Sequence, residues 1–262
     1  MDLEEIRKHW EKAGEHMSVS EKVTSTSRDP FLGQLEEKYI QEHLNANQHI
    51  AEVGCGDAIH TLEYSKKVKS ITGVDIARSL IKKAKKRVSL EAYDNVEFVV
   101  GSVLELEKVI DDKPVDCVIS QRCLINLPSW KYQKKAIQQI YKVLKPNGLF
   151  LMTEGFQDEL DNINCLREKF GLSTIKVVKY NRNLEHREFD EFICRYFNIE
   201  LMRHYGVYTF FSRVYHPLVV LPDEPKHDSR LNEVAYLLSN QIDIPNFKRY
   251  SYNLFYALRK KS

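Results

Sequence analysis

The chain has 262 residues, of which 43% are hydrophobic and 29% charged, a balance typical of a globular domain and not of a disordered or fibrous chain. Its formal net charge is only +2, so overall charge favours neither nucleic acid nor an anionic membrane as a partner. No apolar run approaches the roughly 18 residues of a membrane span, and the N-terminal residues are charged, unlike a signal peptide.

These features predict a cytoplasmic protein that folds as a single domain over residues 1–262. The five cysteines are odd in number and none forms a Cys-x-x-Cys pair, so we expect reduced thiols and no metal site.

Two helices are predicted before the first strand. Residues 2–14 carry apolar side chains at helical spacing, namely Leu3, Ile6 and Trp10. Asp29 followed by Pro30 indicates the N-cap and first turn of a second helix. Residues 18–28, between the two helices, have the composition of a loop. We expect residues 1–46 to form a helical lid.

From residue 50 onward, predicted strands and helices alternate. The strands are expected at 50–53, 71–76, 96–100, 115–120, 149–153, 197–204 and 252–258. The helices are expected at 59–68, 79–90, 129–144 and 160–170, with a turn at 145–148. This alternation predicts an α/β fold: a Rossmann-like, doubly wound, mainly parallel seven-stranded sheet with helices on both faces.

The chain is expected to divide its functions between two halves. Residues 47–156 would form the cofactor-binding half and residues 157–262 the substrate half. Within the second half, residues 205–247 contain four prolines that cannot lie in central strands. That segment is too long for a plain connection and is expected to form a cap.

The stretch from Glu52 to Ala58 joins the first strand to the first helix of the sheet. Gly54 and Gly56, which flank Cys55, allow the backbone to turn sharply and approach a ligand. A dinucleotide-binding turn needs a further glycine at the position of Ile59, so pyrophosphate binding is not indicated. An acid before the turn suits a ligand with a positively charged amino group.

Asp75 ends the second strand, 19 residues after Gly56. An acid at this position can accept hydrogen bonds from both hydroxyls of a ribose. Without the glycine turn, a helix N-cap or a solvated loop acid would be the preferred interpretation. The two features together favour an adenosine ligand.

Over residues 48–156 the chain resembles the class I S-adenosylmethionine-dependent methyltransferases. Besides the glycine turn, the resemblance is carried by GVDI at 73–76, NVEFVVG at 95–101 and LKPNGLFL at 144–151. It implies that Glu52 sets the methionine end of the cofactor, which lies against the turn at 54–56. It also implies that Asp75 holds the ribose and that Ile76 packs on the adenine.

One position departs from that family's pattern. Ser102 stands where the family often has an aspartate that accepts from the adenine amino group, although Ser102 and the Val103 N–H can still form hydrogen bonds. Gln121, after the fourth strand, is expected near the transferred methyl group. Arg28 is a weaker candidate for the cofactor's carboxylate, since a solvated loop arginine is more common.

The acceptor is expected at the carboxyl ends of the fourth and fifth strands. Arg122 could clamp an anionic group or pack under the next helix, and the Asn126 amide is expected to cap the local turn. Glu154 could act as a general base or orient the acceptor.

Residues 205–217 are dense in aromatic and polar side chains. An aromatic core helix is the preferred interpretation for the apolar members of this segment. Tyr205, Arg213 and Tyr215 are candidates for acceptor binding. The ordinary chemistry of an imidazole suits base catalysis at neutral pH, and we favour His216 over Glu154 as the base.

The second half is similar to methyltransferases of bacterial surface-polysaccharide (capsule) biosynthesis. The similar segments are 126–128, 160–164 and 224–226. This resemblance implies O-methylation of a sugar, a sugar phosphate or an activated precursor. Arg122, Arg213 and Lys226 would suit an anionic acceptor of that kind.

Other functions remain open to different degrees. A nucleic-acid methyltransferase is disfavoured, because residues 120–123 are SQRC and not an Asn-Pro-Pro-Tyr type of run. A protein or another small metabolite remains open as the acceptor. A non-catalytic, methyltransferase-like binding subunit is also open, although Glu52 and Asp75 argue against it.

Overall fold

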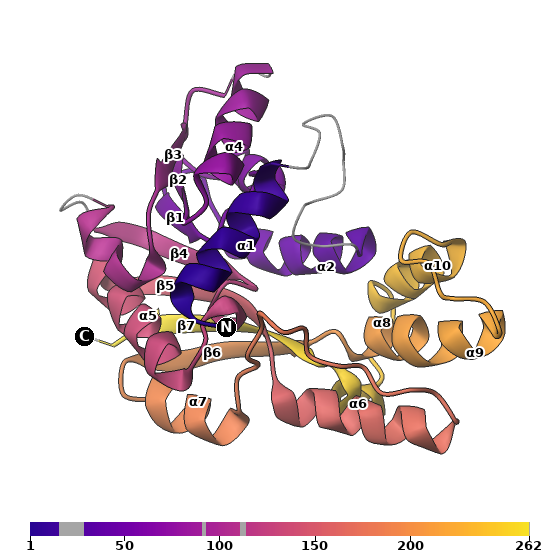
Figure 1. Ribbon diagram of the computed structural model, residues 1–262. Coiled ribbons are helices and arrows are strands. Elements are labelled where there is room, and N and C mark those ends of the chain that lie inside the picture. The colour runs from indigo at the N-terminus through magenta and orange to yellow at the C-terminus, as the bar shows by residue number, and fades with distance from the viewer. Residues whose placement is uncertain (16–28, 91–92, 111–113, 262) are drawn as a thin grey trace.

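The computed structural model describes residues 1–15, 29–90, 93–110 and 114–261. Its centre is a seven-stranded sheet in the order β3-β2-β1-β4-β5-β7-β6 (Figure 1). The strands are β1 (His49–Val53), β2 (Ser70–Asp75), β3 (Val96–Val100), β4 (Val115–Gln121), β5 (Leu144–Gly155), β6 (Phe197–His204) and β7 (Asn253–Lys260). Strands β1 to β5 pair in parallel, and β7 runs antiparallel to both of its neighbours. The expected mainly parallel, seven-stranded α/β fold is confirmed.

The central strands are mostly buried, and each carries apolar side chains on both faces of the sheet. On β5, Phe150 and Met152 join the core on one face, while Leu149 and Leu151 join the core on the other. Successive side chains of a strand point to opposite faces, so a strand covered by helices on both sides reads as a continuous apolar run.

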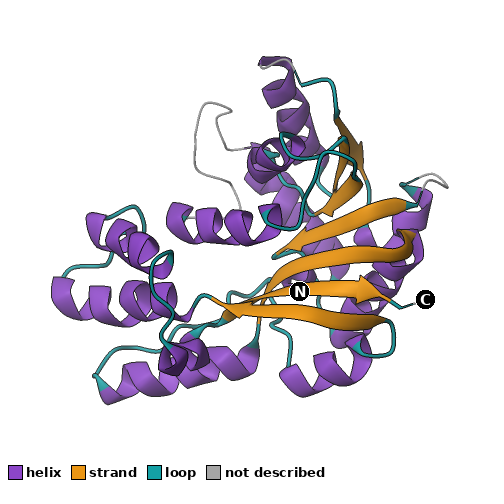
Figure 2. Ribbon diagram, turned by 180° about the vertical axis from the view of Figure 1, so that it is seen from behind, coloured by secondary structure: helices purple, strands orange, loops and turns teal. Residues whose placement is uncertain are grey.

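Helices cover both faces of the sheet (Figure 2). One face packs against η1 (Val103–Lys108), α5 (Trp130–Val143) and α7 (His186–Ile193). The other face packs against α2 (Pro30–Gln41), α3 (Ile59–Ser65), α8 (Gly206–Phe210) and α10 (Arg230–Ser239). A smaller apolar cluster joins α4 (Arg78–Leu90) to α3 and β3.

Helix α1 (Leu3–Glu15) is separate from these layers and docks on the start of α4 (Figure 1). The Ser79 hydroxyl donates to the Glu11 carbonyl at 2.7 Å, and a Cβ on Gly14 would lie 2.1 Å from Ser79 Oγ. Glycine is therefore needed at this close crossing. At the start of α2, the Asp29 side chain accepts from the Leu32 N–H at 3.0 Å, which confirms the expected N-cap.

The turn expected at 145–148 lies inside β5 and does not precede it. Leu144 pairs with Val115 and Leu149 with Cys117, so several extra residues of β5 bulge between two close positions of β4. Asn147 has a φ of 59°, the left-handed conformation that such a local excursion favours. Helix α7 was not anticipated, and α6 (Gln157–Lys169) begins earlier than the expected residue 160.

The segment after β6 forms a helical lobe at one side of the molecule (Figure 1). One helical run passes through α8, η3 (Phe211–Tyr215) and α9 (His216–Val220), and α10 and η4 (Pro245–Tyr250) follow it. A Cβ on Gly206 would lie 1.9 Å from the Phe247 carbonyl oxygen, so α8 touches η4 at this glycine. Within the described ranges, no helix is both long enough and apolar enough to cross a membrane.

Candidate active site

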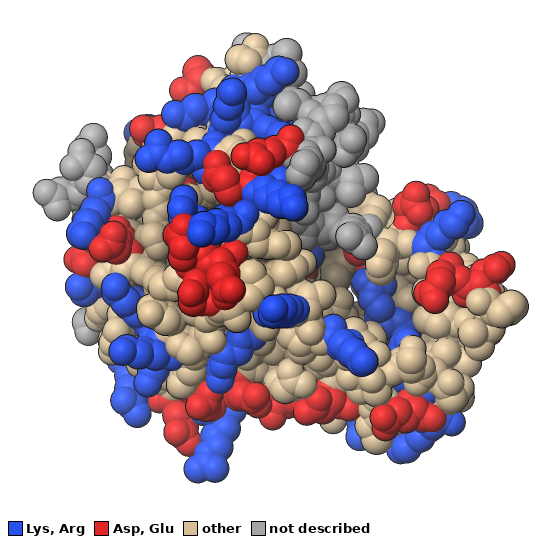
Figure 3. All heavy atoms as spheres, in the orientation of Figure 1, with Lys and Arg blue, Asp and Glu red and all other residues tan. Residues whose placement is uncertain are grey.

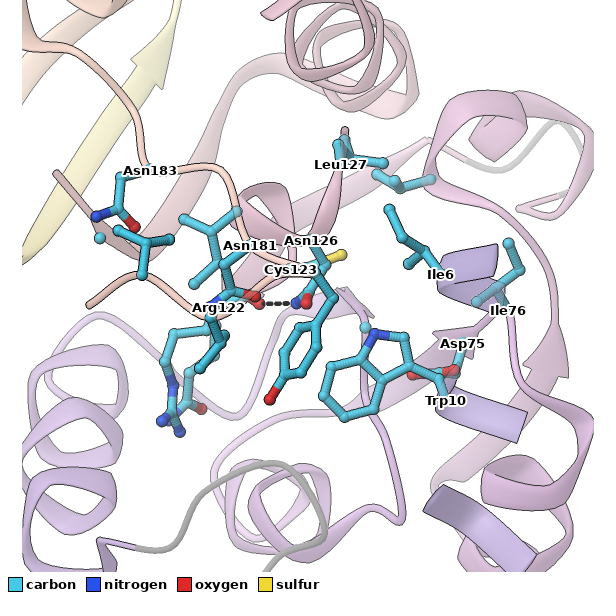
Figure 4. A pocket seen from close by; sticks show the side chains of 18 of the residues that line it. Ile6, Trp10, Asp75, Ile76, Arg122, Cys123, Asn126, Leu127, Asn181 and Asn183 are labelled. Atoms are coloured by element: carbon cyan, nitrogen blue, oxygen red, sulfur yellow. Dashed lines mark hydrogen bonds between the residues drawn. The ribbon is translucent and has the colours of Figure 1, made fainter. Parts of the chain in front are cut away.

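A cavity of about 310 Å³ lies at the carboxyl edge of the sheet (Figure 4). The chain winds from β1 outward to β2 and β3, and from β4 outward in the other direction, so the edge between β1 and β4 is a topological switch point. Seven of the expected site residues line this cavity: Gly54, Asp75, Ile76, Ser102, Val103, Gln121 and Arg122. Glu52, Cys55 and Gly56 do not line it, and Arg28 lies outside the described residues.

The glycine turn forms one wall of the cavity. Gly54 and Gly56 have φ angles of 71° and 55°, in the left-handed region that glycine enters without strain. A Cβ on Gly54 would also lie 2.8 Å from the Cβ of Cys123. Both the conformation and the close approach of the two loops therefore require glycine at position 54.

Asp75 lies beside this turn and faces the cavity. Its carboxylate accepts from the backbone N–H of Gly56 at 3.0 Å and of Ala77 at 2.8 Å, one on each oxygen. A carboxylate has about four acceptor positions, so each oxygen retains a lone pair for a ligand. Burial raises the pKa of Asp75 to about 6.

Glu52 lies behind the turn and does not reach the cavity. It is 3% exposed and accepts from the Thr61 hydroxyl at 2.5 Å. Burial raises the pKa of its carboxyl to about 7. The Glu52 side chain thus ties β1 to α3, and its expected role at the methionine end of the cofactor stays a prediction.

Ser102 and Val103 begin η1 at the opposite wall of the cavity. The Ser102 side chain accepts from the Leu104 N–H at 3.2 Å and caps this short helix. The hydroxyl proton of Ser102 is not used by that bond, so Ser102 can still donate to a ligand.

Gln121 is held by a buried network that was not anticipated. Its amide accepts from the Tyr64 hydroxyl at 2.9 Å and donates to Glu36 at 2.8 Å. Glu36 also accepts from Asn253 at 3.1 Å and pairs with Arg122 at 3.3 Å. The signal for Glu36 was its position on the apolar stripe of α2, where an acid must find partners.

Helix α1 supplies an apolar side of the same cavity, through Leu3, Ile6 and Trp10. The Trp10 ring meets Tyr180 edge to face, with 5.4 Å between centroids, and His9 stacks on Tyr180 at 4.2 Å. Trp10 therefore lines the same cavity as Asp75 (Figure 4). That residues 1–46 act as a lid stays a prediction.

Two side-chain amides that line the cavity, those of Asn126 and Asn181, have an oxygen that accepts no hydrogen bond from the described residues. The Asn126 Nδ2 donates to the Arg122 carbonyl at 2.6 Å, as expected of a turn cap. The Oδ1 atoms of Asn126 and Asn181 are buried, and neither has a hydrogen-bond partner in the described part of the chain. Because unpartnered buried acceptors are uncommon, these two oxygens can accept from a ligand in the cavity.

Glu154 is fully buried behind the loop that follows β4. It accepts from the Ser120 hydroxyl at 2.6 Å and from the backbone N–H groups of Cys123, Leu124 and Ile125 at 2.9–3.1 Å. Burial raises its pKa to about 7. Glu154 does not line the cavity, so its carboxylate does not lie where it was expected to meet the acceptor. Its hydrogen bonds instead hold the backbone of residues 123–125.

A second cavity, of about 510 Å³, adjoins the first and shares Arg122, Ile175 and Tyr252 with it. Arg213 and His216 line this second cavity and not the first. Nδ1 of His216 lies 2.9 Å from the amide oxygen of Asn232. The Nδ2 group of the same Asn232 amide donates to the His227 carbonyl at 3.0 Å. The amide oxygen can only accept, so Nδ1 carries a proton and Nε2 is the nitrogen that can take one up.

Tyr205 and Tyr215 lie away from both cavities, contrary to the expectation that they bind the acceptor. Tyr205 is 2% exposed, lies 3.0 Å from the Thr153 hydroxyl and stacks on Tyr39. Tyr215 is 45% exposed and packs on Phe211. Tyr215 ends the π-helical turn at 211–215, which directs its side chain differently from a regular helix, whereas Tyr205 lies before α8 and packs inward.

An acid at the end of β2 beside a glycine turn suits an adenosine ligand, and β7 inserted antiparallel between β5 and β6 completes the architecture of the class I S-adenosylmethionine-dependent methyltransferases. A sequence profile described as "Methyltransferase domain" matches residues 44–191, more than half of the chain. The chain therefore belongs to the methyltransferase-domain family.

Individual relatives agree with this assignment. The ubiquinone/menaquinone biosynthesis C-methyltransferase UbiE of Rickettsia akari (strain Hartford) is 30% identical over 125 residues, 45% of this chain and 48% of that relative. The match thus spans about half the length of the curated relatives. Their names give no support to the expected resemblance to surface-polysaccharide methyltransferases.

Two solved structures share the fold over nearly the whole chain. Magnesium protoporphyrin IX methyltransferase (ChlM) of Synechocystis PCC 6803, with bound S-adenosylhomocysteine, has a TM-score of 0.60 at 12% identity, covering 100% of both chains. N-methyltransferase NodS of Bradyrhizobium japonicum WM9, in complex with S-adenosylhomocysteine, has a TM-score of 0.57 at 10% identity, covering 98% of both.

Proposed function

We propose that this chain transfers the methyl group of S-adenosylmethionine to a small polar acceptor. The observation that carries the proposal is the placement of Asp75, whose two oxygens are oriented by Gly56 and Ala77 at the edge of a ligand-sized cavity. A buried carboxylate with open lone pairs, facing apolar walls, suits the two ribose hydroxyls of an adenosine.

The remaining lining residues suit the rest of the cofactor. Ile76 is adjacent to Asp75 and would pack on the adenine, with Ser102 and Val103 offering hydrogen bonds to its edge. The unpartnered oxygens of Asn126 and Asn181 would accept from the α-ammonium group. The cofactor supplies an electrophilic methyl group on a sulfonium, and the chain's own task is to position the acceptor and exclude water.

The acceptor would approach from the second cavity, because the two cavities share walls at Arg122 and Tyr252. His216 lines that cavity with Nδ1 already committed to Asn232, so its Nε2 is our proposed general base for a hydroxyl acceptor. In the described ranges, no group of three or more His, Cys, Asp or Glu side chains is arranged to hold a metal ion.

We also propose, more specifically, that the acceptor is a sugar, a sugar phosphate or a related precursor that is methylated on oxygen. Polar and basic side chains around the second cavity support this class. The named relatives methylate other atoms, since one is a C-methyltransferase and another an N-methyltransferase. A panel of sugars, amines, quinols and peptides, incubated with the protein and radiolabelled S-adenosylmethionine, tests this choice directly.

Calorimetry with S-adenosylhomocysteine tests the cofactor site. Asp75→Ala should weaken binding about tenfold or more, because it removes hydrogen bonds to a charged acceptor. Asp94→Ala is a matched control, since Asp94 is an exposed acid on the loop before β3 that does not line the cavity. Equal affinities for the wild type and the Asp75 variant would contradict the site.

A further inference from the structure

The second cavity opens between the body of the molecule and the lobe of α8, α9 and α10. Its walls come from the ends of α2 and α6, the loop after β4, the η3–α9 run and the 221–227 segment. Figure 3 shows basic side chains inside the hollow beside that lobe. Three arginines line the cavity: Arg122, Arg167 and Arg213.

Two of these arginines are already neutralised by buried acids. Arg213 forms an ion pair with Asp29, whose other oxygen accepts from the Tyr208 hydroxyl at 2.6 Å. Arg122 pairs with the buried Glu36 at 3.3 Å. Each of these two charges is therefore compensated within the protein.

Arg167 has no such compensation. It is 8% exposed and donates to two carbonyl oxygens, that of Ser173 at 2.8 Å and that of Arg213. No acid of residues 1–15, 29–90, 93–110 or 114–261 forms an ion pair with it. Burial lowers its pKa, and the positive charge of Arg213 lowers it further.

Acidic residues at the rim of the second cavity do not compensate the positive charge of Arg167. Asp223 and Glu224 line the cavity but are exposed, so water solvates their charges. A buried guanidinium beside a second one is costly unless an anion joins them. The planar forks of arginine match the oxygens of phosphate and carboxylate groups.

We propose that the second cavity is the acceptor site and that Arg167 binds a phosphate or carboxylate group of a small anionic acceptor. This inference rests on the proposed methyl transfer and narrows its substrate class. The shared wall at Arg122 and Tyr252 leads to the cofactor cavity, so an acceptor anchored by its anionic end would direct its reacting atom toward the cofactor.

The test is a titration of the S-adenosylhomocysteine complex with inorganic phosphate, and separately with acetate, at constant ionic strength maintained with chloride. Phosphate or acetate should bind once per chain without displacing S-adenosylhomocysteine. Arg167→Gln should weaken that binding about tenfold or more, because charge-assisted hydrogen bonds are lost. The probe that binds more tightly identifies the anionic group of the acceptor as a phosphate or a carboxylate.

Arg187→Gln is the matched control, since the Arg187 side chain is 90% exposed and pairs only with Glu191 among the described residues. It should leave phosphate binding unchanged. If Arg167→Gln does not fold, Arg167→Lys keeps the charge without the planar fork, and binding should still weaken several-fold. Absent binding, displacement of S-adenosylhomocysteine, or equal loss in the control overturns the inference. Failure of S-adenosylhomocysteine itself to bind overturns the proposed function instead.

Discussion

Asp75 shows how one side chain joins the fold to the ligand site. The carboxylate ties the end of β2 to the glycine turn through the Gly56 N–H and still faces the cavity. The burial that makes these bonds strong also makes ionisation harder, which raises the pKa of Asp75 from 3.8 to about 6.

Cofactor affinity should consequently depend on pH. Ribose hydroxyls donate to the ionised carboxylate, so the form present above the pKa binds. Affinity for S-adenosylhomocysteine should be full near pH 8 and fall up to about tenfold per pH unit below pH 6, as Asp75 takes up a proton. Calorimetry from pH 5 to pH 8 measures this. In Asp75→Asn that fall should be missing, and identical profiles for both proteins would refute the assignment.

Glu36 and Glu154 illustrate the opposite use of a buried acid. Glu36 binds Gln121, Arg122 and Asn253, and Glu154 binds the backbone of the loop after β4. Neither lines a cavity, so both orient the residues that do. An acid at the carboxyl edge of a sheet is thus not by itself evidence of a general base.

Among the secondary-structure elements, α1 supplies an apolar side of the first cavity. It crosses the cavity on apolar side chains and is anchored to α4 at Gly14 and Ser79. Lids of this kind exclude water and complete a site on closure. We expect α1 to contact the cofactor when it binds, because Leu3, Ile6 and Trp10 line the cavity.

Tryptophan fluorescence can report on α1. The chain has two tryptophans, and Trp130 packs on Phe192 away from both cavities, so Trp130→Phe leaves Trp10 as the only indole. Its emission should change on titration with S-adenosylhomocysteine and saturate at the dissociation constant given by calorimetry. The converse variant, Trp10→Phe, should show almost no change. A silent Trp10 would argue against contact between α1 and the cofactor.

At the scale of the whole molecule, the buried acids make stability depend on pH. Glu52 lies on the central strand β1, and burial raises its pKa from 4.5 to about 7. The folded protein holds the proton of this carboxyl more tightly than the unfolded chain does. The resulting stabilisation is fully present below the pKa of the unfolded chain, and it is lost as the pH rises through the pKa of the folded protein.

The variant Glu52→Gln isolates this effect, since the amide oxygen can still accept from Thr61. Between pH 4 and pH 8 the cofactor-free wild type should lose roughly 3 kcal/mol of unfolding free energy relative to the variant. Urea unfolding at each pH measures the difference. A constant difference across that range would show that Glu52 does not titrate as its burial implies.

The fold could be predicted from the sequence, as could seven of the residues that line the first cavity, because their signals are local. Period-two and helical patterns, the glycine turn and the acid ending β2 each occupy a few neighbouring residues, and the order of alternating elements prescribes a doubly wound sheet. The predictions for the bulge at 145–148, for Tyr205 and for Tyr215 were wrong. The pairing register, the contacts of Tyr205 with Thr153 and Tyr39, and the π-helical turn that ends at Tyr215 depend on neighbours distant in sequence.

Only the tertiary structure decided which charges are paired and which are not. From the sequence, Arg122 and Arg213 were candidates to bind an anionic acceptor, with packing under the next helix as the alternative for Arg122, but Glu36 and Asp29 neutralise them. Arg167 drew no attention and is the buried cation without an acid among the described residues. Electrostatic compensation is set by distances between residues up to 184 positions apart, and no local pattern encodes such distances.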